Sequence, residues 1–250
     1  YGLSRLFMLN PFNKKTPTIL TLHGGDIQAE QGKTNQVRLT KMILRKAKAA
    51  VTLNGRMTGI AGKYCSNIHQ IPCSVDTSLF IPPQNRTPLS DTDPIKVIFP
   101  SSPSRPVKNY PLFRDTVDRI SAMTGRRCTV SAVEGMSRQE VARLYRHSDM
   151  MIMTSVSEGS PQVVKEAMAC NLPIVSTNVG DVADLLDGVE NCTWSDSHDS
   201  GSLCSKAIDV IQGKIHGIPA RKKIAEMGLD HDSTARKIYR LYQSVLSAHE

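Results

Sequence analysis

The sequence predicts an α/β fold with parallel strands, and one stretch in its second half shows the pattern most fully. The apolar run 149–154 is long enough for a buried parallel strand. Ser160 and Pro161 then have the form of a helix start, with Ser160 as the N-cap and Pro161 at the first helical position. Asn171 fits a left-handed C-cap, and the apolar residues after Pro173 begin the next strand. The stretch therefore predicts a strand, a helix and a second strand in direct succession.

The loop before this helix is a candidate ligand site. The first helical amides, those of Gln162 and Val163, would present N–H groups at the positive end of the helix dipole, where a phosphate can bind. Glu158 and Gly159 end the strand, and Glu166 lies inside the helix. In a continuous helix, the two carboxylates would be about 12 Å apart. A pair of acids acting on one glycosidic bond needs about 5 Å. The spacing instead suits two carboxylates that hold separate hydroxyl-bearing parts of one extended ligand, although either could simply favour the dipole or face solvent.

The rest of the chain alternates between strand patterns and helix patterns. Apolar runs predict strands at 18–22, 50–53, 95–99 and 128–133. Amphipathic spacing predicts helices at 37–49, 57–64, 112–123, 137–147, 203–212, 219–227 and 233–248. Ser137 and Glu140 form a capping box at the start of one of them. The segment 82–94, rich in Pro, Ser, Thr and Asp, predicts a linker.

Two further sets of polar residues follow predicted strands. The turn His23–Asp26 can bring backbone and an imidazole close to a ligand, although a lone His after a strand is more often structural. Arg105 and Lys108 lie in the loop after the strand 95–99. Cations in that position can stabilise the charge of an anionic leaving group, but loop cations are also commonly solvated.

Composition limits the function classes. The chain has 250 residues, 40% of them hydrophobic and 22% charged, which suits one large or two small globular domains. The net charge of +8 favours anionic partners such as nucleotide diphosphates, lipid phosphates or an acidic membrane surface. Sparse aromatic residues, 5% of the total, and the lack of a recognition motif argue against nucleic acid. Six cysteines without a Cys-x-x-Cys pair argue against zinc and favour a reduced, cytoplasmic location.

The central motif resembles that of a known family. Glu158-Gly-x-Pro-x-x-x-x-Glu166-Ala-Met-Ala continues with Pro173-Ile-Val-Ser-Thr and then Val179-Gly180. This pattern resembles the Glu-x7-Glu signature of the family-4 glycosyltransferases. These are retaining, nucleotide-sugar-dependent enzymes with two Rossmann-like lobes, the GT-B fold. The similarity extends from about Thr18 to the end of the chain and is strongest at 149–186.

The resemblance implies a division into lobes. Residues 1–81 would form an incomplete N-terminal, acceptor-side lobe, and residues 82–94 the linker. Residues 95–230 would form a complete nucleotide-sugar-binding lobe, and residues 231–250 a helix that packs back toward the first lobe. Family members have a longer first lobe with a Gly-rich loop. The chain is therefore expected to be a fragment, to have a reduced first lobe, or to have the missing part supplied elsewhere.

The resemblance also implies roles for individual residues. His23 would contact the donor sugar from the first lobe, Glu158 would hold sugar hydroxyls, and Glu166 the ribose. The residues implied in catalysis are His23, Glu158 and Lys108, and those implied in donor binding are Arg105, Lys108, Glu158, Gly159, Ser160, Gln162, Val163 and Glu166. The loop 133–136 would hold the nucleotide base. No metal and no cofactor is expected, because the cations and amides would serve the diphosphate.

Two functions remain open at this point. The first is a hexosyltransferase that uses a UDP- or GDP-sugar and a glycan or lipid-linked acceptor, in polysaccharide or glycolipid synthesis, with peripheral contact to an anionic membrane. The second is a nucleotide-sugar-binding module without transferase activity of its own. A two-lobed nucleotide-sugar epimerase is a further alternative, but it would need an acid–base pair that the sequence does not reveal.

Overall fold

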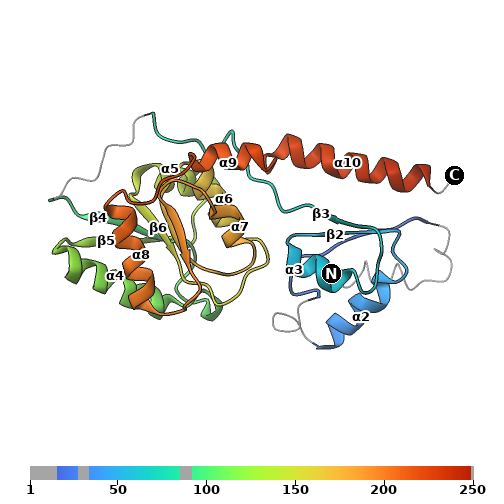
Figure 1. The fold of residues 1–250 in the computed structure, drawn as a ribbon, viewed down its shortest axis with the longest axis horizontal. Helices are drawn as coiled ribbons and strands as arrows, with labels where there is room; N and C mark the ends of the chain where they lie inside the picture. Colours follow the sequence, from blue (N-terminus) through green and yellow to red (C-terminus); the bar gives the residue numbers. More distant parts are fainter. Residues whose placement is uncertain (1–15, 28–33, 85–91, 249–250) are drawn as a thin grey trace. The chain divides into compact units, whose positions relative to one another are not determined.

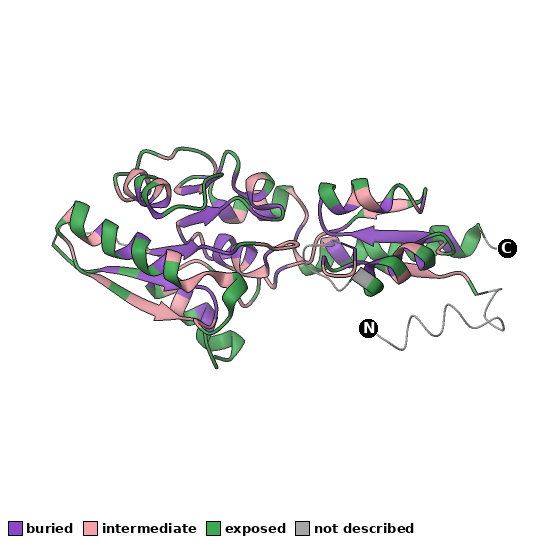
Figure 2. Cartoon of the chain, turned by 90° about the horizontal axis from the view of Figure 1, so that it is seen from below, coloured by how far each residue is buried: buried purple, intermediate pink, exposed green. Residues whose placement is uncertain are grey.

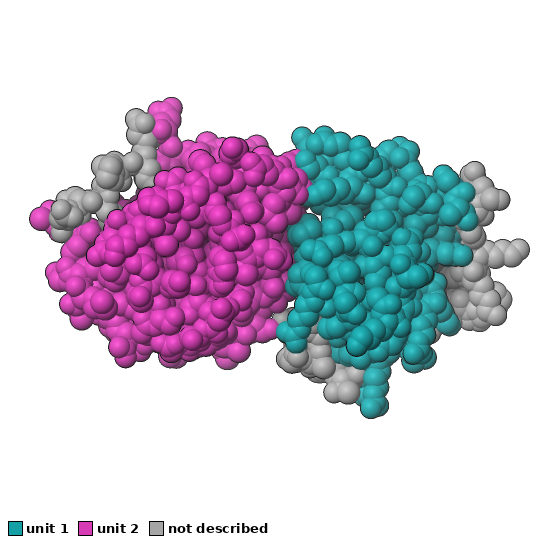
Figure 3. Space-filling model, in the orientation of Figure 1, with its two compact units in different colours: residues 1–73, 232–250 teal, residues 74–231 magenta. Residues whose placement is uncertain are grey.

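The computed structural model describes residues 16–27, 34–84 and 92–248. The chain divides into two compact units, coloured separately in Figure 3. Unit 1 contains residues 1–73 and 232–250, and unit 2 contains residues 74–231. Within the described residues, no helix is long and apolar enough to cross a membrane.

Unit 1 is built on a small parallel sheet with the strand order β1-β2-β3. Its elements are β1 (Ile19–Thr21), α2 (Thr34–Leu44), β2 (Ala49–Thr52), α3 (Gly55–Ala61) and β3 (Ile68–Gln70). Leu44 and Met57, from the two helices, join one apolar core. In a second apolar core, Leu241 and Val245 of α10 (His231–Ser247) pack with Val51 of β2, the central strand.

Helix α2 is shorter than predicted. The Ala- and Lys-rich sequence favours a helix as far as Ala49, but the helix ends at Leu44. Ala49 instead starts β2 and pairs with Ile19 of β1. Ala49 and Ala50 are fully buried in this strand, so sheet pairing and burial override local helix propensity here.

Unit 2 contains a five-stranded parallel sheet with the strand order β5-β4-β6-β7-β8. Figure 1 labels β4, β5 and β6 of this sheet among the helices of the unit. The strands are β4 (Ile95–Phe99), β5 (Cys128–Ala132), β6 (Met150–Met153), β7 (Ile174–Thr177) and β8 (Cys192–Ser195). The chain runs from β4 outward to β5 and then returns to the other side of β4 to form β6. The strand order therefore reverses between β4 and β6. In sheets of this kind, ligands bind at the carboxyl ends of the strands beside such a reversal.

Helices cover both faces of this sheet. They are α4 (Tyr110–Thr124), α5 (Arg138–His147), α6 (Gln162–Ala169), α7 (Val182–Leu186), α8 (Ser200–Ile211) and α9 (Ala220–Glu226). Phe113 of α4 and Leu203 of α8 belong to one core, whereas Tyr145 of α5 and Val164 of α6 belong to the other. Every residue of β6 and β7 is buried, as the purple strands of Figure 2 illustrate. A sheet covered on both faces explains the continuous apolar run that predicted β6.

The boundary between the units lies earlier than the predicted end of the first lobe at residue 81. Residues 74–81 pack with unit 2, where Phe80 is fully buried and its ring centroid is 6.1 Å from that of Tyr145. The amide of Val75 donates to the Leu229 carbonyl at 2.8 Å. The Arg221 guanidinium donates to the carbonyl of Phe80 at 2.7 Å. Part of the predicted linker 82–94, namely residues 85–91, lies outside the described residues.

Candidate active site

The predicted donor-binding residues gather at the carboxyl edge of the unit 2 sheet. Lys108 lies in the loop after β4, and Glu158 lies in the loop after β6. These two strands are neighbours at the point where the strand order reverses. The topology therefore brings two charged residues, far apart in sequence, to the position where doubly wound sheets bind ligands.

The loop after β4 is fixed to the loop after β6 by main-chain and side-chain hydrogen bonds. Residues Pro106–Lys108 form a short 3-10 turn, and Asn109 after it has a left-handed backbone with φ of 51°. The Thr154 hydroxyl donates to the Lys108 carbonyl at 2.9 Å. The Val156 amide donates to the Val107 carbonyl at 2.9 Å. These bonds hold the backbone of Lys108 in register with the loop that carries Glu158.

Lys108 and Glu158 form an ion pair through Nζ and Oε1. Their side chains are only 12% and 16% exposed. Removing one partner of a mostly buried pair of this kind leaves the other charge uncompensated. The cation predicted for the diphosphate and the carboxylate predicted for the sugar thus neutralise each other in this structure. Arg105, by contrast, is exposed at the start of the same turn.

The start of α6 differs from the prediction by one residue. Pro161, with φ of −68° and ψ of 114°, is the N-cap, and the first helical residue is Gln162. Ser160 does not cap the helix because its hydroxyl donates to Asp181 Oδ2 at 2.5 Å and accepts from the Lys165 ammonium at 2.5 Å. The amides of the first helical residues have no partner inside the helix, so those of Gln162 and Val163 stay at the start of α6 as predicted, and phosphate binding there stays a prediction. The left-handed Asn171, with φ of 49°, is confirmed just beyond the helix.

The side chains of Gln162 and Val163 are committed elsewhere. Gln162 Nε2 donates to the Ser74 carbonyl at 2.7 Å, and Gln162 Oε1 is buried without a hydrogen-bond partner among the described residues. Val163 packs against the apolar core. Only the main-chain amides of these two residues can serve a ligand at the loop.

Glu166 occupies a dry environment on α6. Burial raises the pKa of its carboxyl from 4.5 to about 7, while the Arg138 guanidinium opposes the rise. Arg138 Nη2 lies 3.7 Å from Glu166 Oε1, and its guanidinium also stands over the Phe80 ring at 5.5 Å. A carboxyl that titrates near neutrality can accept or donate a hydrogen bond, which suits it to hydroxyl groups of a ligand.

The loops after β5 and β7 complete this edge. Ser102 donates a short hydrogen bond to Glu134, which joins the predicted base-binding loop 133–136 to the loop after β4. In the loop after β7, Gly180 has φ of +66°, and a Cβ there would lie 2.6 Å from the Gly159 carbonyl oxygen. The capping box of Ser137 and Glu140 at the start of α5 is confirmed.

His23 lies in unit 1, just after β1, whereas all the other predicted site residues lie in unit 2. Its amide donates to Asp26 Oδ2 at 2.8 Å, which tightens the turn predicted at this position. The His-Gly-Gly-Asp sequence therefore forms the local turn that the sequence indicated.

Comparison with known proteins finds sequence similarity to glycosyltransferases. Residues 106–213 match the family model of glycosyl transferases group 1. The chain is 31% identical over 98 residues to a D-inositol 3-phosphate glycosyltransferase of Mycolicibacterium smegmatis, covering 39% of this chain and 22% of that protein. It is 28% identical over 102 residues to an uncharacterized glycosyltransferase of Methanocaldococcus jannaschii, covering 40% of this chain and 28% of that protein. The chain thus spans between 16% and 28% of the length of the curated relatives it matches.

Solved structures show the same architecture. Anabaena HepE in complex with UDP superposes with a TM-score of 0.75 at 14% identity, over 96% of this chain and 76% of that one. The pneumococcal O-GlcNAc transferase GtfA, in complex with UDP and GlcNAc, gives a TM-score of 0.70 at 14% identity, over 98% and 55%. The fold is GT-B.

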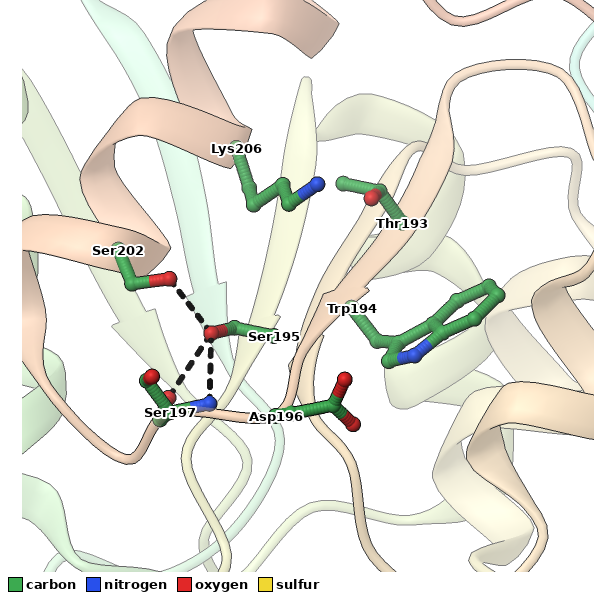
Figure 4. A pocket seen from close by; sticks show the side chains of 7 residues that line it. All are labelled: Thr193, Trp194, Ser195, Asp196, Ser197, Ser202 and Lys206. Carbon is green, nitrogen blue, oxygen red and sulfur yellow. Dashed lines mark hydrogen bonds between the residues drawn. The ribbon is translucent and has the colours of Figure 1, made fainter.

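The GT-B chain also contains a pocket that the sequence did not indicate. It has a volume of about 440 Å³ and lies at the end of β8 and the start of α8. Its lining residues are Thr193, Trp194, Ser195, Asp196, Ser197, Ser202 and Lys206 (Figure 4). The Ser195 hydroxyl already contacts that of Ser202 at 2.6 Å and donates to the Ser197 carbonyl at 2.9 Å. A ligand would have to compete for these groups, and none of the predicted site residues lines the pocket.

Sequence reasoning missed Lys165 and Asp181, which the GT-B fold buries directly behind the Glu158 loop. Lys165 lies within the Glu-x7-Glu motif, where a helical Lys is ordinarily expected to face solvent. Asp181 lies in the loop after β7, where a polar residue gives no local signal of burial.

Proposed function

We propose that this chain is a retaining glycosyltransferase of the family-4 type that moves a hexose from a UDP- or GDP-sugar to a glycan or lipid-linked acceptor. The observation that carries the proposal is the Lys108–Glu158 pair beside the first amides of α6, at the strand reversal of the unit 2 sheet. A cation, a carboxylate and helix amides in one place suit a sugar diphosphate. The group 1 match supports this assignment. So do the neighbours described in complex with UDP or UDP-glucose.

On this proposal each group serves one part of the donor. The Lys108 ammonium and the amides of Gln162 and Val163 bind the diphosphate, with Arg105 at the edge of the same turn. Glu158 accepts hydrogen bonds from sugar hydroxyls. Glu166, further along α6, binds the ribose hydroxyls. When the donor arrives, the diphosphate takes over Lys108 and the sugar takes over Glu158, so each charge exchanges one partner for another.

The reaction proposed is displacement with retention. The bond between the anomeric carbon and the donor phosphate oxygen breaks, and a bond from that carbon to the acceptor oxygen forms on the same face. The acceptor proton passes to the departing phosphate oxygen, so no protein base is required. Negative charge grows on the diphosphate as the bond breaks. The fixed Lys108 ammonium and the amides at the start of α6 stabilise that charge. On this proposal these groups supply the positive charge that the diphosphate needs once the donor is bound, so the proposed mechanism uses no metal and no cofactor.

The acceptor is proposed to be anionic or presented at an anionic surface. Unit 1 contains 14 Lys and Arg against 4 Asp and Glu, a net charge of +10, whereas unit 2 has a net charge of −2. In unit 1, Lys41 and Arg45 stand over the Tyr64 ring at 5.6 Å and 5.3 Å from its centroid. Such a charge bias favours acidic lipid or glycan partners. Sedimentation with anionic and with neutral vesicles tests it, because equal binding to both would remove the electrostatic argument.

A nucleotide-sugar-binding module without turnover is the alternative function. It is favoured by one observation, namely that every proposed donor residue except His23 lies in unit 2. The two functions differ in product formation. A module would bind UDP-glucose but release no UDP when an acceptor is added. His23→Ala should lower turnover without weakening UDP binding if His23 serves the sugar.

The test of the proposed function is a binding panel by calorimetry with UDP, GDP, UDP-glucose and GDP-mannose. Saturable binding of one nucleotide, lost in Lys108→Ala, supports the proposal. The matched control is Lys206→Ala, which removes a cation from the β8 pocket at the same edge of the sheet. No binding of any nucleotide, or equal losses in the two variants, would contradict the proposal.

A further inference from the structure

Three polar side chains form a buried bridge behind the loop that carries Glu158. The Lys165 ammonium donates to Ser160 Oγ at 2.5 Å, and the Ser160 hydroxyl donates to Asp181 Oδ2 at 2.5 Å. Lys165 is 0% exposed and Asp181 is 6% exposed. We call these three residues the Lys165–Ser160–Asp181 bridge. Lys165 lies in α6 and Asp181 in the loop after β7, and Ser160, just before α6, connects them.

The position of Lys165 is unfavourable on two counts. A buried ammonium is costly unless a counter-charge and hydrogen bonds compensate it. A cation near the first turn of a helix is also repelled by the dipole. Asp181 supplies the counter-charge: burial raises the pKa of its carboxyl, while Lys165 and the Ser160 hydroxyl oppose that rise. A residue in a locally unfavourable position, compensated by a residue distant in sequence, is expected mainly at functional sites.

The bridge meets a second contact on the same loop. Gly180, directly before Asp181, has φ of +66°, and a Cβ there would lie 2.6 Å from the Gly159 carbonyl oxygen and 3.2 Å from that of Glu158. The loop after β7 therefore approaches the Glu158–Gly159 backbone more closely than any side chain at residue 180 would allow, while Asp181 binds Ser160. On the opposite side, Thr154 and Val156 tie the same loop to the loop after β4.

We propose that the Lys165–Ser160–Asp181 bridge is a positioning device for the donor site. It fixes the Glu158–Gly159 backbone against the start of α6, so that the Glu158 carboxylate meets the donor sugar. Lys165 and Asp181 do this without touching the donor. The role in sugar binding rests on the proposed function, whereas the fixing of the loop does not.

The experiment uses the double variant Lys165→Met/Asp181→Asn, which removes both charges at similar volume and leaves no buried ion unpaired. Ser160→Ala removes the shared hydroxyl and serves as a second, milder variant. Hydrogen exchange of residues 154–161 is measured by mass spectrometry without ligand. Affinities for UDP and UDP-glucose are measured in parallel. The segment should exchange at least about tenfold faster in the variants, and the affinity for UDP-glucose should fall about tenfold more than that for UDP.

A matched control separates positioning from general destabilisation. Val210→Ala shortens a buried side chain of α8 that belongs to the other core of unit 2. This control should destabilise the protein but leave the ratio of the two affinities unchanged. Wild-type exchange rates at 154–161 in the double variant, or the same change of ratio in the control, would overturn the inference. Faster exchange in a protein that binds no nucleotide would support the fixing of the loop and overturn the proposed function alone.

Discussion

Replacing Glu166 by Gln tests the electrostatics of the candidate site, because burial raises the pKa of this carboxyl from 4.5 to about 7. The unfolded chain loses this proton near pH 4.5, whereas the folded chain keeps it until the pH passes about 7. The folded state therefore binds more protons between these values, and the free energy of unfolding falls as the pH rises through them. Above this window the loss is about 3 kcal/mol, since a change of one in pKa corresponds to about 1.4 kcal/mol.

Gln is a neutral analogue of the protonated carboxyl, so Glu166→Gln should avoid this loss. We expect the variant to exceed the wild type in stability by up to about 3 kcal/mol at pH 8.5 and to match it near pH 4. Urea denaturation of both proteins without nucleotide, across this pH range, measures the difference. Glu140→Gln is the matched control. Hydrogen bonds from Ser137 lower the pKa of Glu140, so its stabilisation is present above the unfolded pKa and is lost as the pH falls. An advantage of Glu166→Gln that does not grow with pH refutes the reasoning.

Three further outcomes follow from the proposed donor site. UDP or GDP at a hundredfold excess over its dissociation constant should stabilise the chain by about 2.7 kcal/mol in EDTA, measured by thermal denaturation; a gain that the chelator abolishes would show that a metal is needed. Lys108→Ala should weaken diphosphate binding by about 1.5–3 kcal/mol, and Arg105→Ala much less because that side chain is exposed, so equal losses by calorimetry would contradict the assigned geometry. Glu158→Gln should spare free nucleotide and weaken the nucleotide sugar, whereas Glu166→Gln should weaken both; titrations that show one pattern for both variants would mean that the two carboxylates do not serve separate ends.

Local signals predicted much of unit 2 correctly. The strand 95–99 is confirmed residue for residue, because five successive residues with little polar interruption leave few alternatives. The capping box at Ser137 is confirmed because its two hydrogen bonds depend only on residues three apart. The loop and helix of the central motif were placed within one residue. The GT-B fold was predicted from the family resemblance carried by this motif rather than from periodicity.

The errors share a different physical origin, since each depends on residues distant in sequence. Ser160 is a good N-cap locally, but its hydroxyl bonds to Asp181 instead. The helix predicted to continue to Ala49 stops because a strand partner, Ile19, is available. Lys165 would be assigned to solvent by any local rule, and its burial becomes understandable only when Asp181 is placed beside it. Competition from tertiary contacts, which no short window contains, decided all of these positions.

The arrangement of charges in unit 2 follows from the way the sheet is covered. Its strands have helices on both faces, so a charged side chain can reach a ligand from the loops at the strand ends or from the first turns of the helices that follow them. At the carboxyl edge, the loops after β4, β6 and β7 each supply one polar group to the same small region: Lys108, Glu158 and Asp181. Lys108 and Glu158 pair with each other across their two loops, and Asp181 is compensated by Lys165 of α6. The paired charges leave this region nearly neutral, which limits the cost of burying its ions. A ligand that separates Lys108 from Glu158 but binds only one of them leaves the other charge uncompensated. The site therefore favours a ligand that offers an anion to Lys108 and hydroxyl groups to Glu158 at the same time.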